Sequence, residues 1–108
     1  MAKYMIQIGI NPQAYVSMLQ NPQDRAVVTR PLFEALGGKL EQYFFELGGS
    51  TAYIITEMSE PNDLAALCSA IQAGGAVTSI KASLIISSDE AVGIAEKAAK
   101  IAYQPPSA

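Results

Sequence analysis

The side chains most able to do chemistry fall on three segments that alternate apolar and polar residues. Alternate residues of a strand project to one face of a sheet, so these side chains share a face if the segments pair as expected. They combine a phenol, a carboxyl group and an amine, which can bind polar ligands or transfer protons. The candidate ligand-binding residues are Gln7, Tyr53, Glu57, Ser79 and Lys81.

Two interpretations of this set of residues differ in what they require. Mixed with the apolar Met5 and Ile55 and with Ser83, the set suits a small-molecule pocket between two sheets. It also suits a semi-polar dimer interface in which Glu57 and Lys81 pair or stay hydrated. The interface needs no special chemistry, so it is the preferred interpretation.

Other reactive groups are scarce in this chain. It contains no histidine and one cysteine, Cys68, so the usual general base and the usual zinc ligands are missing, and no metal or cofactor is expected. The serines lack a histidine partner for a hydrolytic triad. The glycine pairs at 37–38, 48–49 and 74–75 match no phosphate-binding pattern and are typical of turns and helix ends.

Two single residues have competing interpretations. Cys68 lies on an apolar helix stripe, where a small buried side chain is its ordinary role and a reactive thiol the alternative. Arg25 follows a proline-containing break and could anchor an anion, but a surface ion pair or a solvated helix face is the simpler interpretation.

Composition bears on the partners of the protein. The net charge is −3 and the seven basic residues are dispersed, which does not favour nucleic acid. The chain is 50% hydrophobic and 16% charged, yet no apolar run is long enough for a membrane helix, so the surplus apolar surface predicts self-association. The N-terminus shows no export signal, so a cytoplasmic location is expected.

The alternating segments and the signals between them predict the elements of the fold. Strands are expected at 3–10, 39–47, 51–58 and 76–86, with a glycine turn at 48–50. Helices are expected from Asn11-Pro12 to about residue 20, from Asp24 to residue 36, after Pro61, and after a capping box at Ser87.

The apolar stripes of the helices predict what each helix buries. The second helical segment carries a stripe at Val28, Leu32, Ala35 and Leu36, and the helix after Pro61 carries one at Leu64, Leu67, Cys68 and Ile71. The last helix carries a stripe of mostly small residues at Ala91, Ile94, Ala95, Ala98, Ile101 and Ala102.

The order β-α-β-β-α-β-α predicts an α+β, ferredoxin-like domain with an added C-terminal helix. One four-stranded antiparallel sheet would carry two helices on a single face, and a second copy could cover the opposite face. We expect one domain over residues 1–108, of which 103–108 are a tail.

Four short segments, at 21–25, 36–41, the hairpin near Gly48-Gly49 and 74–77, together resemble the GYD-domain family of small bacterial proteins. The resemblance implies a dimeric α/β-barrel arrangement and no settled biochemical role. The family is named for a Gly-x-Tyr-Asp-like stretch at the hairpin. The matching positions here are Gly48, Gly49, Ser50 and Thr51, so the tyrosine and the acid are replaced.

Three functional hypotheses follow. The first is a small-molecule-binding or interaction dimer with no established catalytic activity. The second is a cofactor-independent oxygenase or isomerase of the dimeric α/β-barrel type, in which Tyr53 acts with Glu57 or Lys81 as acid and base. The third is a structural or regulatory module in a larger oligomer.

Overall fold

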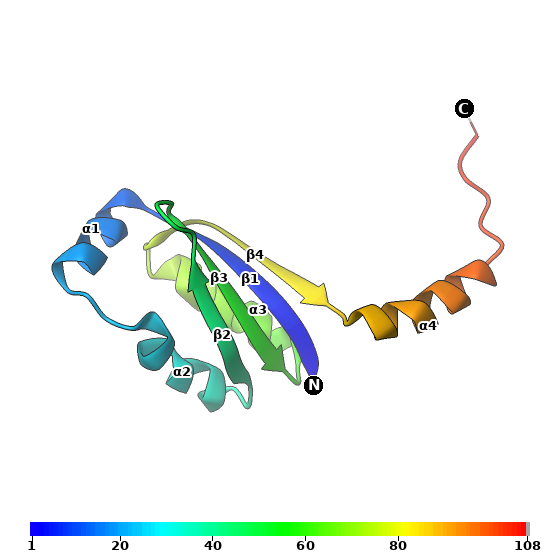
Figure 1. Cartoon of the computed structure of the whole chain (residues 1–108), viewed down its shortest axis with the longest axis horizontal. Helices are drawn as coiled ribbons and strands as arrows, with labels where there is room; N and C mark the ends of the chain where they lie inside the picture. The colour runs from blue at the N-terminus through cyan, green and yellow to red at the C-terminus, as the bar shows by residue number, and fades with distance from the viewer. Residues whose placement is uncertain (108) are drawn as a thin grey trace.

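The computed structural model describes residues 1–107, so Ala108, the last residue of the predicted tail, lies outside it. The described residues form four strands and four helices (Figure 1). In order they are β1 (Ala2–Ile10), α1 (Pro12–Gln20), α2 (Arg25–Ala35), β2 (Lys39–Phe45), β3 (Thr51–Met58), α3 (Pro61–Ala73), β4 (Val77–Ile85) and α4 (Ser88–Ala99).

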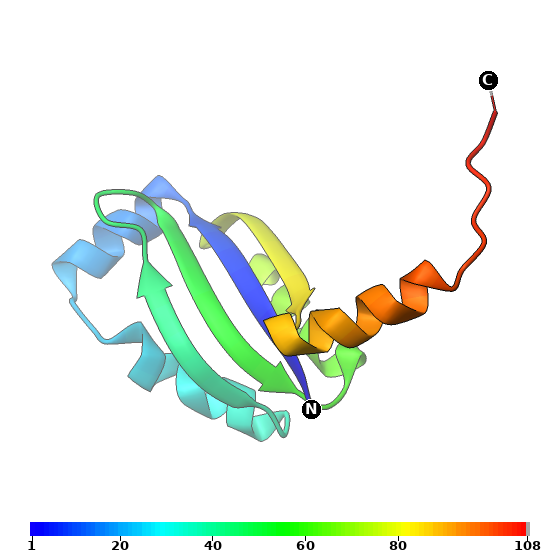
Figure 2. The same cartoon turned by 45° about the vertical axis from the view of Figure 1, so that its right-hand side comes forward.

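The four strands form one antiparallel sheet in the order β2-β3-β1-β4. Helices α2 and α3 pack on the same face of the sheet, which we call the helix face (Figures 1 and 2). The opposite face, which we call the open face, is covered by no helix among the described residues. The predicted α+β, ferredoxin-like fold with a C-terminal helix is thereby confirmed.

The core lies between the helix face and the two helices that pack on it. Alternate residues of the central strands β1 and β3 are buried there, and α3 contributes Leu64 and Leu67, as its stripe predicted. Among the residues described, the buried polar one is Thr56, whose hydroxyl group donates a hydrogen bond of 2.8 Å to the carbonyl oxygen of Lys39. A buried hydroxyl that keeps a partner costs little stability.

The predicted stripe of α2 is wrong at Val28, Leu32 and Ala35, which are exposed, and right at Leu36. Val28 and Leu32 are 45% and 52% exposed, whereas Phe33 is 1% exposed and partly buried Ala26 and Leu36 pack beside it. The helix carries two apolar stripes, and the one with the aromatic ring is buried because it removes the larger area from water.

In the fourth strand Ile80, Ala82 and Leu84 pair with core residues of β1, but of these three only Ile80 is partly buried. Leu84 is nevertheless 62% exposed, because β4 is an edge strand.

The helices begin where the sequence predicts, because polar side chains satisfy their free N–H groups. The side chain of Asn11 accepts from the Ala14 amide at 2.8 Å, and that of Asp24 accepts from the Ala26 amide at 3.0 Å. The Ser87 hydroxyl group accepts from the Glu90 amide, which is one half of a capping box, and it donates to the Glu90 carboxylate.

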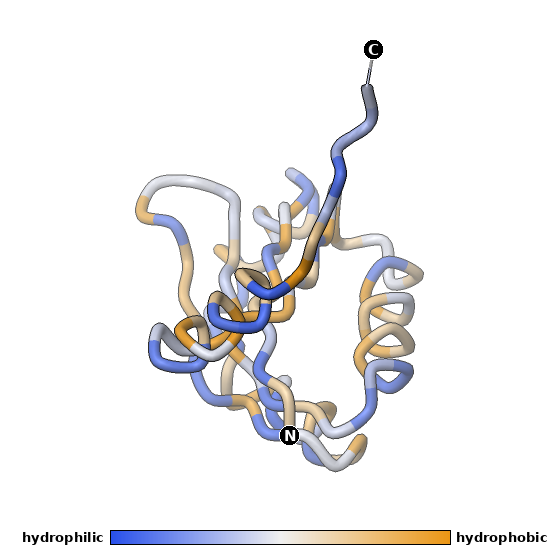
Figure 3. Tube along the Cα trace, turned by 90° about the vertical axis from the view of Figure 1, so that its right-hand side faces the viewer, coloured by the Kyte–Doolittle hydropathy of each residue, from blue (hydrophilic) through white to orange (hydrophobic). Residues whose placement is uncertain are grey.

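Helix α4 projects away from the sheet (Figures 1 and 2). Every residue from Ile86 to Ser107 is exposed, and the projecting segment mixes hydrophobic and hydrophilic residues (Figure 3). The radius of gyration is 17.4 Å, against about 13 Å for a compact chain of this length. The chain therefore consists of a packed sheet layer and an arm that has no partner among the described residues.

Candidate functional site

The open face brings the predicted candidate residues onto one surface. In the register of the sheet, Gln7 of β1 stands directly between Tyr53 of β3 and Lys81 of β4. Ser79 lies in the next row across the sheet, opposite Gly9. The predicted sharing of a face is therefore confirmed, whereas a role of these residues in ligand binding stays a prediction.

Glu57 lies at the other end of this face. It pairs with Lys3 of β1 and Lys39 of β2, four residues along the strands from the row that holds Lys81. Four residues span about 13 Å and two strand spacings span about 10 Å, so the Cα atoms of Glu57 and Lys81 are about 16 Å apart. An ion pair between these two residues, one of the expectations above, does not form.

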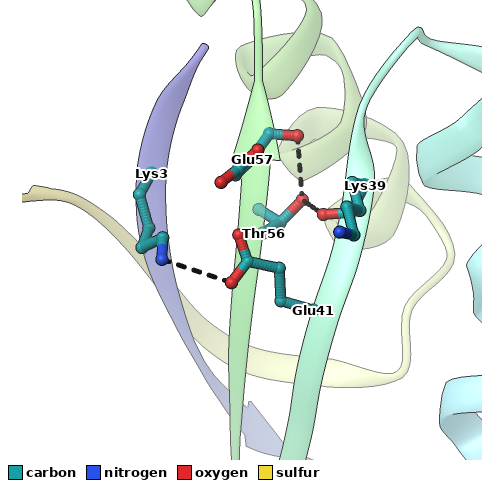
Figure 4. Close-up of polar contacts among 5 residues, drawn as sticks. All are labelled: Lys3, Lys39, Glu41, Thr56 and Glu57. Carbon is teal, nitrogen blue, oxygen red and sulfur yellow. Dashed lines mark hydrogen bonds and ion pairs between the residues drawn. The ribbon is translucent and has the colours of Figure 1, made fainter.

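Glu57 belongs to a cluster of polar side chains from the strands β1, β2 and β3 (Figure 4). The ammonium group of Lys3 lies 3.3 Å from a carboxylate oxygen of Glu41. Hydrogen bonding with the Glu57 side chain and then the Lys3 ammonium hold the pKa of Glu41 below its usual value. Glu41 reaches this group because the β2–β3 register shifts between Leu40 and Gln42, which is a bulge.

The side chain of Tyr53 forms its hydrogen bond with the hairpin and not with Glu57 or Lys81. Its hydroxyl group donates to the Glu46 carboxylate at 3.3 Å. Its Cα atom lies about 13 Å from that of Glu57 and about 10 Å from that of Lys81 by strand geometry. This spacing disfavours a shared acid–base role for the three residues.

The family-motif positions form the turn between β2 and β3. Gly48 has a φ of +72°, a conformation that side chains disfavour, which explains a glycine there. The carbonyl oxygen of Ser50 accepts from the Ile10 amide at 2.8 Å, and the carbonyl oxygen of Thr51 accepts from the Glu46 amide at 2.9 Å. In this chain Ser50 and Thr51 thus fix the hairpin through their backbone.

A cavity of about 430 Å³ lies on the helix face, between the sheet and helices α1, α2 and α3. Apolar side chains dominate its lining, and Arg25 and Tyr43 add a guanidinium and a phenol. A second cavity of about 390 Å³ beside α1 and the hairpin shares Arg25. Sequence spacing cannot reveal such a cavity, since it depends on how far the helices lie from the sheet. The proline break before Arg25 was its one sequence signal.

Cys68 behaves as the core interpretation predicts. It packs against the core, and burial raises the pKa of its thiol, which disfavours the reactive thiolate. Within residues 1–107, no cluster of three or more acidic, cysteine or histidine side chains is placed to hold a metal ion. None of the helices described has the length and apolar character needed to cross a membrane.

Comparison with known proteins gives one match. The family model described as GYD domain matches residues 4–95 of the 108-residue chain, which include the sheet and most of α4. No curated protein and no solved structure matches the chain.

Proposed function

Because the chain belongs to the GYD-domain family, we propose that the protein is a homodimer that serves in small-molecule binding or in interaction, with no established catalytic activity. The observation that carries the dimer is the amount of surface that one copy leaves exposed.

The exposed area is too large for a compact monomer. A folded protein of 11.4 kDa exposes about 5,800 Å², whereas this chain exposes 7536 Å². The excess is roughly 1,700 Å² per chain. Two copies together therefore expose an excess of about 3,400 Å², which lies in the range of total area that obligate homodimers bury. A second copy is the occupant that this area fits.

Two surfaces supply the excess. The open face carries partly buried Met5, Ile55 and Ile85 and, at the β2 edge, Phe44, which is 51% exposed. The arm α4 adds exposed Val92 and Ile94. Two open faces packed against each other, with each arm lying on the partner, form the dimeric α/β barrel that we propose.

The mixed chemistry of the open face supports an interface more directly than a catalytic centre. Gln7 and Lys81 can hydrogen-bond across a contact between copies, and the charges near Glu57 are already balanced by Lys3 and Lys39. We also propose a cytoplasmic location, because the free thiol of Cys68 suits a reducing compartment.

The test is the mass of the protein in solution, measured by light scattering after size-exclusion chromatography over a range of concentrations. We expect twice 11.4 kDa for the wild type. Ile55→Glu, which puts a charge in the middle of the open face, should give a monomer. Val27→Glu, which changes an exposed residue of α2 on the helix face, should remain a dimer. A wild type that stays monomeric at all concentrations overturns the proposal.

A further inference from the structure

The cavity on the helix face has the shape and lining of a binding site. Its volume of about 430 Å³ falls within the range of small-molecule pockets, and most of its wall is apolar. The helices α1, α2 and α3 and all four strands contribute to its lining, which includes Ala14, Met18, Phe33, Ile54 and Ile71.

The polar groups of the lining differ in what they can offer a ligand. The hydroxyl group of Thr29 donates to the Arg25 carbonyl oxygen at 2.6 Å, and that of Ser17 donates to the Gln13 carbonyl oxygen at 3.1 Å. Both hydroxyl hydrogens are therefore used within their own helices. The guanidinium of Arg25 hydrogen-bonds the Tyr43 side chain and keeps further N–H groups, and the hydroxyl hydrogen of Tyr43 is the other donor in the lining.

The charge of the lining is unbalanced. The described residues around this cavity include Arg25 and no aspartate or glutamate. The neighbouring Asp24 carboxylate accepts from the Ala26 amide as a helix cap, and the ion pair that the described residues form joins Lys3 to Glu41. Burial raises the pKa of Tyr43 although nearby Arg25 opposes this, so the phenol stays a donor at neutral pH.

We propose that this cavity binds a small amphipathic carboxylic acid, with its apolar part against the core and its carboxylate at Arg25 and Tyr43. An apolar cavity of about 150 Å³ accepts benzene, so this one accommodates roughly ten to fifteen non-hydrogen atoms. The carboxylate matches the planar guanidinium, which favours paired hydrogen bonds. An uncharged ligand of the same length forms no such charge-assisted pair and should bind more weakly.

This inference does not rest on the proposed dimer. The cavity lies on the helix face, whereas the proposed contact between sheets uses the open face, so each can fail while the other holds. The α4 arm of a partner is the one part of the dimer that could compete for the cavity, and the test below includes that outcome.

The experiment is a titration of the full chain with decanoate, followed by amide chemical shifts in NMR and by calorimetry, with decanol as the uncharged ligand of equal length. We expect saturable decanoate binding that shifts resonances of α1, α2 and α3. Arg25→Gln should weaken decanoate binding at least about tenfold, the size of one charge-assisted hydrogen bond, and leave decanol binding unchanged. Arg30→Gln, an exposed arginine on the same helix, should change neither.

A second variant tests the apolar part of the site. Ala14→Phe fills the cavity from α1 and should weaken decanoate and decanol binding alike. Three outcomes overturn the proposal. They are the absence of saturable decanoate binding, equal binding by the wild type and Arg25→Gln, and binding only to a chain that ends at Ser87. The last result assigns the cavity to the α4 arm of a partner.

Discussion

The side-chain amide of Asn11 donates a hydrogen bond to the carbonyl oxygen of Gly75, 64 residues further along the chain. The Asn11 backbone amide donates to the Ala76 carbonyl oxygen beside it at 3.0 Å. The same side chain also caps α1 by accepting from the Ala14 amide. One residue thus joins the start of α1 to the loop between α3 and β4.

We expect the two roles of Asn11 to separate by mutation. Asn11→Ala removes the cap and the bond to Gly75, and should lower the free energy of unfolding by about 2 kcal/mol. Asn11→Ser keeps a capping oxygen but is too short to reach Gly75, so it should cost about half as much. Urea denaturation measures both. A loss for Asn11→Ser close to zero would mean that the bond to Gly75 adds no stability, and equal losses for the two variants would mean that the cap adds none.

Phe33 should be the residue of α2 on which stability depends most. Phe33→Ala leaves a cavity in the core and should lower the free energy of unfolding by about 3–5 kcal/mol. Val28→Ala, on the stripe that faces solvent, should lower it by less than about 1 kcal/mol. Chemical denaturation compares the two variants. If both lose a similar free energy of unfolding, Val28 is as buried as Phe33 and this account of α2 is wrong.

The ion pair across the open face should be visible in the titration of Glu41. Lys3→Met removes a cation that favours the charged carboxylate, so the pKa of Glu41 should rise toward 4.5. Carbon-13 NMR of the side-chain carboxyl group measures this, and an unchanged pKa contradicts the role of Lys3.

The sign of the pH dependence follows from the same pKa. The folded pKa of Glu41 lies below its unfolded value, so its contribution to stability is present above the unfolded pKa. It is lost as the pH falls through the folded pKa. Denaturation of wild type and Lys3→Met at a series of pH values should therefore converge at low pH, and a difference that persists there assigns the effect to packing of the Lys3 side chain.

The sequence predicts the fold well because its helix-capping and turn residues mark the same boundaries as its hydrophobic periodicity. Asn11-Pro12, Asp24 and Ser87 begin helices as expected, and the stripe of α3 is buried as expected. The stripe of α2 misled because Val28 and Leu32 repeat at helical spacing as convincingly as the residues around Phe33. Which stripe is buried depends on how the helix packs against β2, and local spacing does not encode that packing.

The candidate site was predictable in part for a related reason. The period of two along β1, β3 and β4 placed Gln7, Tyr53 and Lys81 on one face, and the register agrees. The bulge near Glu41 was not predictable, because it arises where the hairpin adjusts to the twist of its neighbours. The cavity at Arg25 was out of reach, since it is a gap between elements that are distant in the sequence.

The bulge has a consequence for the way in which a chain this rich in apolar residues avoids aggregation. The edge strands β2 and β4 each expose one row of free backbone groups, which another sheet could extend without limit. The bulge interrupts the pairing of β2, and β4 carries a lysine, Lys81, at mid-strand beside a second register shift between Gly9 and Ile10. Fibre growth from either edge is thereby disfavoured. The open face remains available for contact with a second copy. A face-to-face contact is complete with two copies, whereas an edge-to-edge contact can repeat to form a fibre.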